Sequence, residues 1–443
     1  MLHELSTVLL AAPALVKVLA SLGLILVAYQ LTRRLGASIL AGTFVLGVWA
    51  GYGAGTMARI AWARASSLDT LMLLLVVVQV IWLSSQMAEA GVMQDLVDAV
   101  RARLPRRIAI AVLPATIGLL PMPGGALFSA PLVDACDVNG EIEPTLKAQT
   151  NYWFRHVWEP WWPLYPGVLL AMQITGLDVG QFMIIGIPLT LTAVTGGWLF
   201  LLRRVHPAGA GLEERPRPPE AHFLSLVMPI IVVVAGYTVV RTGHWALVQL
   251  EPGALSLNKY VPMAIGILFA MLALEYQRPI GRDRWRRIML SRRAILLAAI
   301  VLIVRVYGAF IEPDVAGVPQ LAGLMGDEMK TWGIPTFAVI MLVPFVSGLT
   351  MGLAVGFVGA GVTIAMSLLG TAPDQGTVMS TTALAYGSGF VGMMLSPVHV
   401  CHVVTNEHFR TRLRHSTAGL IGPGAAVIAV SAALYHLIGW LWT

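Results

Sequence analysis

The segment NYWFRHVWEPWWPLYP, residues 151–166, brings three ionisable side chains together inside a long apolar region. Ionisable groups at membrane depth are energetically expensive, and they usually face a cavity or a partner. Arg155 can present a planar fork of donors to an anionic group, while His156 or Glu159 can carry a coupling proton. Because Arg155 and Glu159 stand at i and i+4, an internal ion pair on one helical face is the alternative.

A second polar segment, AYGSGFVGMMLSPVHVCH, covers residues 385–402. Its glycines loosen a helix, and Pro397 interrupts it. His399 follows this proline and is therefore the second candidate for a coupling group, with a structural role for a buried histidine as the alternative. The two cysteines, Cys136 and Cys401, suggest no metal-binding cluster.

The chain that must position these residues is predicted to be an all-α polytopic membrane protein. It has 443 residues, of which 57% are hydrophobic and 12% charged, whereas soluble domains carry about 25% charged residues. Many apolar stretches approach the ~20 residues that cross a bilayer. We expect an amphipathic surface helix at 93–104 and spans near 10–31, 38–56, 69–87, 148–177, 180–202, 222–240, 259–276, 294–311, 379–404 and 416–441.

Two further apolar stretches, 108–133 and 335–370, contain glycine-rich breaks. Non-helical backbone at membrane depth is tolerated only where protein buries it or where it lines an aqueous cavity. If each stretch enters and leaves on one face, the arginine-rich loops all fall on one side, as the positive-inside rule requires. We therefore predict two re-entrant hairpins, an inner (cytoplasmic) membrane location, and both termini on the non-cytoplasmic side.

The order of these elements repeats along the chain. Pro114 and Gly118 in the first break match Pro344 and Gly348 in the second at a common spacing. Each half contains three spans, a re-entrant hairpin, a broken helix and a final span, which is an odd number of crossings, so the second half must be inverted. We predict a first inverted repeat at 1–202, a cytoplasmic linker at 203–222 and a second inverted repeat at 223–443, with the broken helices at 148–177 and 379–404.

Structural gaps in corresponding positions of two halves are the best indication of a transporter binding site in a sequence. Helix N-termini at the hairpin tips attract anions, and small residues there allow the backbone to approach a ligand. In each tip we expect the second helix to begin just after Gly125 or Gly356. The coupling candidates are His156, Glu159 and His399. The substrate-binding candidates are Pro123, Gly124, Gly125, Ser129, Asn151, Arg155, Thr350, Gly352, Gly356, Ser388 and Ser396.

Two stretches, LPATIGLLPMPGGALFSAPLVD and NYWFRHVWEPWWPLYPG, resemble the DUF401 integral membrane family. With the paired hairpins and broken helices, nearly the whole chain resembles the ion transporter superfamily of secondary carriers. That resemblance implies a scaffold that dimerises, formed by spans within 10–87 and 222–311, and a transport domain that slides past it as an elevator. The tips differ from the Ser-Asn-Thr of the carboxylate carriers, so the resemblance does not establish a carboxylate substrate or decide between Na+ and H+ as the coupling ion.

These features favour a secondary active transporter that moves a small anionic solute, coupled to H+ or Na+, as a homodimer among membrane lipids. The alternative is an ion channel or a non-transporting membrane subunit. Neither of these would need side chains that couple solute movement to an ion gradient. A membrane-embedded enzyme is disfavoured by the absence of HExxH and GxSxG patterns. We expect no cofactor, no bound metal and no nucleic-acid partner.

Overall fold

The computed structural model describes residues 12–119, 125–137, 140–205, 223–250, 257–313, 315–318, 320–370 and 372–442. Within these residues the regular secondary structure is entirely helical. The all-α class predicted from the composition is confirmed.

The first half contains ten α-helices in the described residues. Two of them, α9 and α10, divide the predicted span 148–177, and α7 and α8 form the first hairpin. In chain order they are α2 (Ala14–Thr32), α3 (Leu35–Trp49), α4 (Ala54–Ala65), α5 (Leu68–Glu89), α6 (Val92–Arg103), α7 (Arg106–Gly118), α8 (Ala126–Ala135), α9 (Pro144–Arg155), α10 (Pro166–Thr175) and α11 (Val179–Phe200).

The second half follows the same order of elements. Here α17 and the chain from α18 to α19 form the second hairpin, with a π-helical turn, η2 (Val358–Val362), inside it. The predicted span 379–404 is divided between α20 and α21. In chain order the helices are α12 (Phe223–Leu250), α13 (Val261–Gln277), α14 (Arg282–Met289), α15 (Arg292–Ile311), α16 (Leu321–Trp332), α17 (Thr336–Met351), α18 (Ala354–Phe357), α19 (Thr363–Ser367), α20 (Gln375–Met394), α21 (Val400–His408) and α22 (Leu413–Trp442).

Three helices were missed by the sequence analysis: α4, α14 and α16. Each has 12 residues or fewer and carries charged side chains. A search for apolar stretches of membrane-spanning length passes over such helices. Because α4 and α14 precede the third long helix of each half, and α16 corresponds in order to α6, they extend the similarity between the halves.

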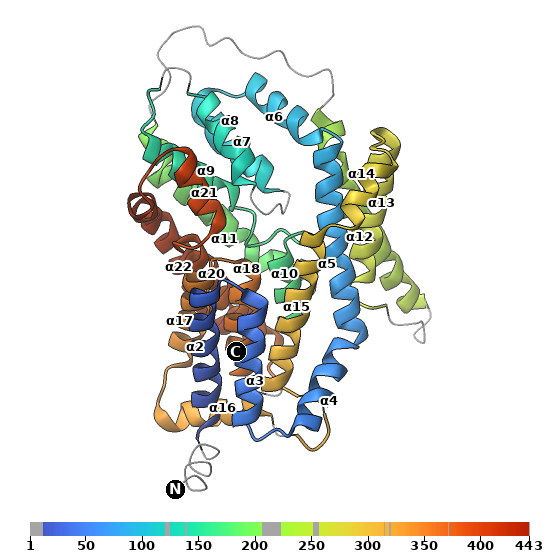
Figure 1. The fold of residues 1–443 in the computed structure, drawn as a ribbon, viewed down its shortest axis with the longest axis vertical. Helices are drawn as coiled ribbons and strands as arrows, with labels where there is room; N and C mark the ends of the chain where they lie inside the picture. The colour runs from blue at the N-terminus through green and yellow to red at the C-terminus, as the bar shows by residue number, and fades with distance from the viewer. Residues whose placement is uncertain are drawn as a thin grey trace.

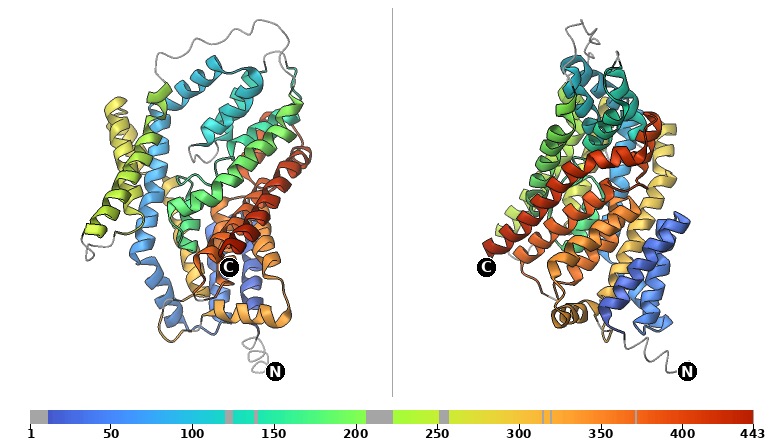
Figure 2. Two further views of the ribbon diagram at one scale, coloured as in Figure 1. Left: turned by 180° about the vertical axis from the view of Figure 1, so that it is seen from behind. Right: turned by 90° about the vertical axis from the view of Figure 1, so that its left-hand side faces the viewer.

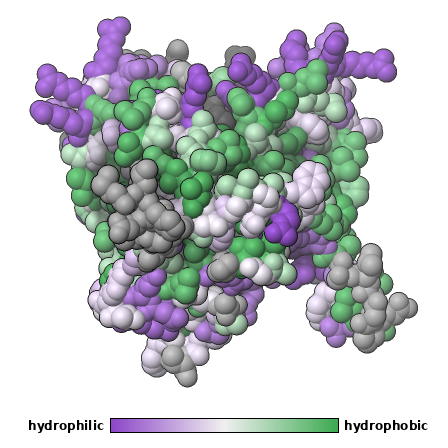
Figure 3. Space-filling model, turned by 60° about the horizontal axis from the view of Figure 1, so that its bottom comes forward, coloured by the Kyte–Doolittle hydropathy of each residue, from purple (hydrophilic) through white to green (hydrophobic). Residues whose placement is uncertain are grey.

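The surface agrees with a protein that crosses a membrane. Among the residues that the structure describes, six helices are long and apolar enough to span a bilayer. On the face shown in Figure 3, hydrophobic side chains form a broad band, and hydrophilic side chains gather mostly toward its upper and lower edges. The chain is therefore a polytopic membrane protein. The six spans are Ala14–Thr32, Leu68–Glu89, Val179–Arg204, Ser225–Leu250, Arg282–Ile311 and Leu413–Trp442.

The helices pack into two groups (Figures 1 and 2). The frame group consists of α2–α5 and α12–α15, in which α15 contacts α3, α4 and α5. The hairpin group consists of α7–α11 and α17–α22, in which α20 contacts both α17 and α22. Helices α6 and α16 each contact both groups. In Figure 1, the first hairpin descends from the end of the molecule that carries α6, and α17 rises from the end that carries α16.

The base of the first hairpin is held by buried charges. Asp137 lies 3.2 Å from Nζ of Lys147 and 3.7 Å from Nη1 of Arg106, and all three residues are buried. Asp137 also accepts the backbone N–H groups of Glu141 and Ile142 at 3.0 and 3.1 Å. Burial lowers the pKa of Lys147, but hydrogen bonds to Asp137 and its neighbour Asp134, with their charges, outweigh burial and raise it above its ordinary value.

Candidate functional site

The two described ends of the first hairpin's break, Gly118 and Gly125, lie against Arg155. Gly125 precedes the first residue of α8, as expected, and its backbone is right-handed helical (φ −56°, ψ −17°). A Cβ atom added to Gly125 would lie 2.8 Å from Nε of Arg155 and closer still to Nη2. A Cβ atom on Gly118, at the end of α7, would overlap the carbonyl group of Arg155. Glycine is therefore needed at Gly118, where backbone atoms of Arg155 are in the way, whereas at Gly125 it leaves room for the end of the Arg155 side chain.

The helix that carries Arg155 ends at that residue. His156 is the C-cap of α9, and the chain makes turns until α10 begins at Pro166. The expected position of Arg155 and Glu159 on one continuous helical face is wrong, because the helix stops between them. Among the described residues Glu159 makes no ion pair within 4.0 Å, and its buried Oε2 has no hydrogen-bond partner.

Aromatic side chains of this break satisfy the carbonyl groups at the end of α7. Nε1 of Trp158 donates to the carbonyl oxygen of Ala115 at 2.7 Å, and Nε1 of Trp162 donates to that of Leu119 at 3.0 Å. The hydroxyl group of Tyr165 donates to the carbonyl oxygen of Gly118. The last carbonyl groups of a helix have no partner within it, and unsatisfied ones are costly in a membrane. The aromatic residues therefore allow α7 to end inside the protein.

The second tip lies against the second break. Gly352 is in the left-handed region (φ +61°), and a Cβ atom there would lie 2.7 Å from the backbone nitrogen of His399 and 2.9 Å from Oγ of Ser396. The next helix, α18, begins at Ala354, so the expected helix start after Gly356 is wrong. Gly356 lies within α18, and its added Cβ atom would contact the side chain of Met351. The tip is set by Gly352 because only a left-handed residue reverses the chain there.

A row of contacts joins the two tips. Nη1 of Arg155 lies 3.2 Å from Nε2 of His156, whose Nδ1 lies 2.7 Å from the carbonyl oxygen of Tyr152. The His156 and His399 rings meet edge to face with centroids 4.9 Å apart. Tyr152 lies beside both rings, at 4.9 and 5.3 Å between centroids, and stacks on His402 at 4.3 Å. The path of contacts therefore runs from Gly125 through Arg155, His156 and His399 to Gly352.

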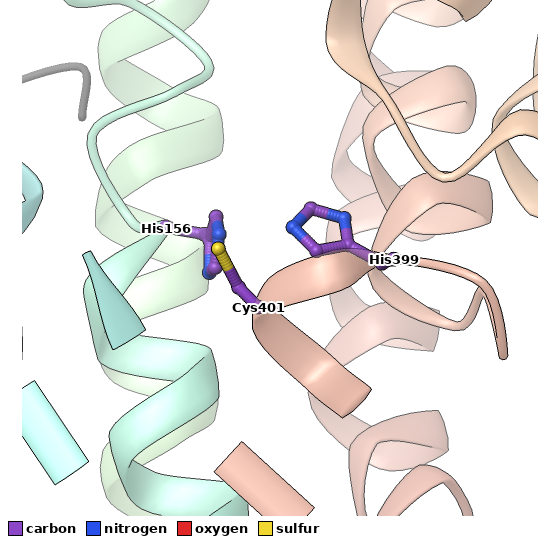
Figure 4. Close-up of side chains that lie close together, drawn as sticks. All are labelled: His156, His399 and Cys401. Atoms are coloured by element: carbon purple, nitrogen blue, oxygen red, sulfur yellow. The ribbon is translucent and has the colours of Figure 1, made fainter. Parts of the chain in front are cut away.

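A cysteine completes this cluster. The ligand atoms of His156, His399 and Cys401 lie within 4.8 Å of one another, and all three residues are buried. Figure 4 shows the Cys401 sulfur beside the His156 ring and one nitrogen of the His399 ring turned toward both. The expectation that neither cysteine belongs to a metal-type cluster is wrong for Cys401. The cluster forms because α21 brings Cys401 beside a break more than half the chain away.

The other candidate residues fall in several places. Asn151 is buried and donates to Oγ1 of Thr405 at 3.1 Å, which ties α9 to α21. Thr350 is not directed to the cluster, since its hydroxyl donates to Val346 in its own helix. Ser129 and Ser388 are buried in α8 and α20, where their hydroxyl oxygens have no partner among the described residues. Pro123 and Gly124 lie outside the described residues.

Two residues of the cluster were not among the candidates. Tyr152 stands four residues before His156, which is one helical turn, so an aromatic ring beside the histidine could have been read from the spacing. Cys401 stands two residues after His399 at the start of a helix following Pro397. A His-x-Cys pattern directly after a predicted break was the available signal. The contact between Cys401 and His156 could not be predicted from the residues around either of them.

The comparison with protein families accounts for nearly the whole chain. Residues 15–438 match the family described as "Protein of unknown function (DUF401)". The chain belongs to the DUF401 family. The resemblance proposed from LPATIGLLPMPGGALFSAPLVD and NYWFRHVWEPWWPLYPG is therefore confirmed for this family. No curated protein matches the chain.

Proposed function

We propose that this DUF401 protein is a secondary transporter of a small anionic solute. The observation that carries the proposal is the path of contacts from Gly125 through Arg155, His156 and His399 to Gly352. Helix interruptions in corresponding positions of two halves characterise transporter binding sites. Here the first tip contacts Arg155, the second tip contacts His399, and His156 lies between these two residues.

Arg155 fits the recognition of an anion. Its guanidinium group presents donors in a fixed plane and keeps its charge in a buried site. The residue is 3% exposed, so an anionic group that reached it would be largely removed from water, where charge-assisted hydrogen bonds are strong. Gly125 leaves the space that the guanidinium fills. A ring nitrogen of His156 lies 3.2 Å from Nη1 of Arg155.

A basic cavity lies beside the first hairpin. A cavity of about 710 Å³ lies between Phe128 of α8 and the frame-group helices α5, α14 and α15. Its lining includes Arg284, Arg287 and Arg293, opposed by Glu89, which pairs with Arg284 at 3.6 Å. A cleft lined mainly by one sign of charge concentrates ions of the opposite sign. The cavity therefore supports anion entry along the boundary between the hairpin and frame groups.

A second polar cavity lies on the same boundary near the other end. It measures about 140 Å³ and is lined by Arg305 and Glu312 of the α15 region and by Thr363 and Ser367 of α19. Cavities at both ends of one boundary fit an elevator, in which the hairpin group slides along the frame group. We propose that two copies associate through their frame groups. A strictly monomeric particle both in detergent and in lipid nanodiscs would contradict that arrangement.

For coupling, H+ and Na+ are the two candidates, and Glu159 is the proposed proton carrier. Its buried carboxylate has an oxygen without a partner among the described residues. A buried carboxylate without an ion pair is more easily accommodated in its protonated form. We expect Glu159→Gln to abolish uptake driven by a pH gradient while solute exchange continues. If gradient-driven uptake survived, or required Na+ alone, the proton-carrier role of Glu159 would be wrong.

The experiment that tests transport uses purified protein in proteoliposomes with a panel of labelled small anions and imposed H+ or Na+ gradients. Arg155→Lys keeps the charge but loses the fork, so uptake of the accepted anion should fall ~10- to 100-fold. Arg241→Lys is the matched control, since Arg241 is exposed and pairs only loosely with Asp178 at 3.5 Å. Equal uptake by the Arg155 variant would contradict the anion site, and an ungated ion current would identify a channel.

A further inference from the structure

The cluster of His156, His399 and Cys401 has the composition of a metal site. We propose that these three side chains bind a monovalent thiophilic cation, Cu(I). Their ligand atoms lie within 4.8 Å of one another, and none of the residues is more than 6% exposed. Cysteine and histidine are the ligands that soft and borderline transition metals prefer.

The orientation of His156 is that of a metal ligand. Its Nδ1 lies 2.7 Å from the carbonyl oxygen of Tyr152. Because a carbonyl oxygen only accepts, Nδ1 carries the proton, and the lone pair is on Nε2. Metal-binding histidines usually donate their other ring N–H to such a carbonyl group, which fixes the ring and its tautomer. Nε2 of His156 is also the atom on the side of the ring that faces Arg155.

The second observation concerns His399. It is 6% exposed, and its Nδ1 has no hydrogen-bond partner among the described residues. Figure 4 shows its ring turned toward His156 and Cys401. The nitrogen that faces them is the one remote from the Cβ atom, Nε2, so a metal ion in the cluster would bind there, while Nδ1 lies on the other side of the ring.

Charge and ligand number select Cu(I) over Zn(II). On binding, the Cys401 thiol forms a metal–sulfur bond and releases its proton to solvent, so Cu(I) with one thiolate is neutral. Zn(II) with one thiolate would leave a net positive charge beside the Arg155 guanidinium, which a buried site disfavours. Structural zinc sites take four protein ligands, and sites with three add a water molecule; this group has three His, Cys, Asp or Glu members among the described residues and is buried.

The bound cation would join the two breaks. His156 caps α9 in the first half, while His399 caps α21 and Cys401 lies in its first turn in the second half. The hydrogen bond between the Cys401 and His156 side chains would be replaced by two metal–ligand bonds. Metal binding is measured directly on the protein, so it does not depend on the proposed transport of an anion.

The test measures Cu(I) binding to the purified full chain in detergent, with ascorbate as reductant and bathocuproine disulfonate as the competing chelator. We expect one Cu(I) per chain and about one proton released per Cu(I). Cys401→Ser, His156→Gln and His399→Gln should each weaken binding by more than ~10-fold. Retention of wild-type affinity by Cys401→Ser, or an absence of Cu(I) binding to the wild-type chain, would overturn the proposal.

Matched controls separate this site from incidental binding. Cys136→Ser alters the other cysteine, and His408→Gln alters an exposed histidine on the same helix, α21. Both should keep wild-type affinity. Zn(II), measured with the same variants, should bind more weakly than Cu(I), and tighter Zn(II) binding would overturn the charge argument. Gel filtration and the thermal unfolding of each variant establish that it is folded.

One further variant distinguishes this proposal from the proposed function. Nη1 of Arg155 lies 3.2 Å from the lone-pair nitrogen of His156, so the guanidinium competes with a cation there. Arg155→Met removes that donor and its charge, and it should abolish anion uptake while Cu(I) binding stays at least as tight. A parallel loss of Cu(I) binding in a folded variant would contradict the proposed site. An intact uptake would instead contradict the anion site alone.

Discussion

The two hairpins occupy the same place in the order of elements, but different interactions hold them. Ion pairs of Asp137 fix the base of the first hairpin, and donors such as Trp158 and Trp162 hold the end of α7. The second hairpin has no ion pair among its described residues and relies on glycines. A Cβ atom on Gly348 would lie 2.7 Å from the backbone nitrogen of Met393, and one on Gly361 would lie 2.5 Å from Cα of Pro344.

This difference predicts how each hairpin responds to change. Side-chain hydrogen bonds and ion pairs are separate interactions, so each can be removed alone, at a cost set by the partner that it leaves unsatisfied. Glycine packing brings two backbones together, and an added methyl group forces one of them to move. We therefore expect the first hairpin to weaken in steps and the second to tolerate almost no added volume.

The largest effect is expected at the base of the first hairpin. Asp137→Asn removes the carboxylate shared by two buried cations, so it should lower the free energy of unfolding by about 3–5 kcal/mol. Tryptophan fluorescence during thermal unfolding in detergent measures this. Asp134→Asn is the control, because Asp134 pairs with the same Lys147 but its side chain is 51% exposed. Equal shifts for the two variants would show that the buried network does not hold the hairpin.

The second hairpin should respond to a single methyl group at its tip. Gly352→Ala puts a side chain into left-handed backbone and against the backbone nitrogen of His399, which should destabilise the protein by about 2–5 kcal/mol. Gly333→Ala separates the two causes, since Gly333 is also left-handed (φ +64°) but a Cβ atom there meets nothing within 4 Å. If both variants lose the same stability, crowding at the second tip contributes nothing.

Local backbone rules explain what the sequence could predict. Proline and glycine interrupt helices wherever they occur, so both breaks and the hairpin regions were recognisable, as was the amphipathic helix found at Val92–Arg103. The start of α18 at Ala354 was missed because it depends on the left-handed conformation of Gly352, and not on the number of glycines nearby. Glu159 was misplaced because the helix ends at Arg155, before the first proline of the break.

The site itself depended on contacts that no local pattern contains. Arg155, His156 and Glu159 were recognised as polar groups in an apolar region, which is a local signal. Their neighbours Gly125 and Cys401 come from other elements, and α8 and α21 pack together from opposite halves of the chain. An arrangement of this kind is set by the packing of helices distant in sequence. It therefore became visible only in three dimensions.

The first tip should lose function before it loses stability. The backbone of Gly125 suits alanine, and the group in the way is the end of the Arg155 side chain. Gly125→Ala should therefore leave the unfolding temperature nearly unchanged but displace the guanidinium, raising the KM for anion uptake by ~10-fold, the equivalent of one charged hydrogen bond. Gly23→Ala is the control, because a Cβ atom there meets nothing within 4 Å. If Gly125→Ala instead caused a large loss of stability and left the KM unchanged, the first tip would respond as the second does, and the proposed difference between the tips would be wrong.

The smallest effect isolates one hydrogen bond of the first hairpin. Nε1 of Trp162 donates to the carbonyl oxygen of Leu119 at 3.0 Å, whereas Nε1 of its neighbour Trp161 is buried without a partner among the described residues. Replacing either tryptophan with phenylalanine removes similar volume, but only Trp162→Phe leaves a helix-end carbonyl group unsatisfied. Trp162→Phe should therefore be about 1 kcal/mol less stable than Trp161→Phe. Equal stabilities would show that aromatic donors do not support the end of α7, and the first hairpin would then depend on packing, like the second.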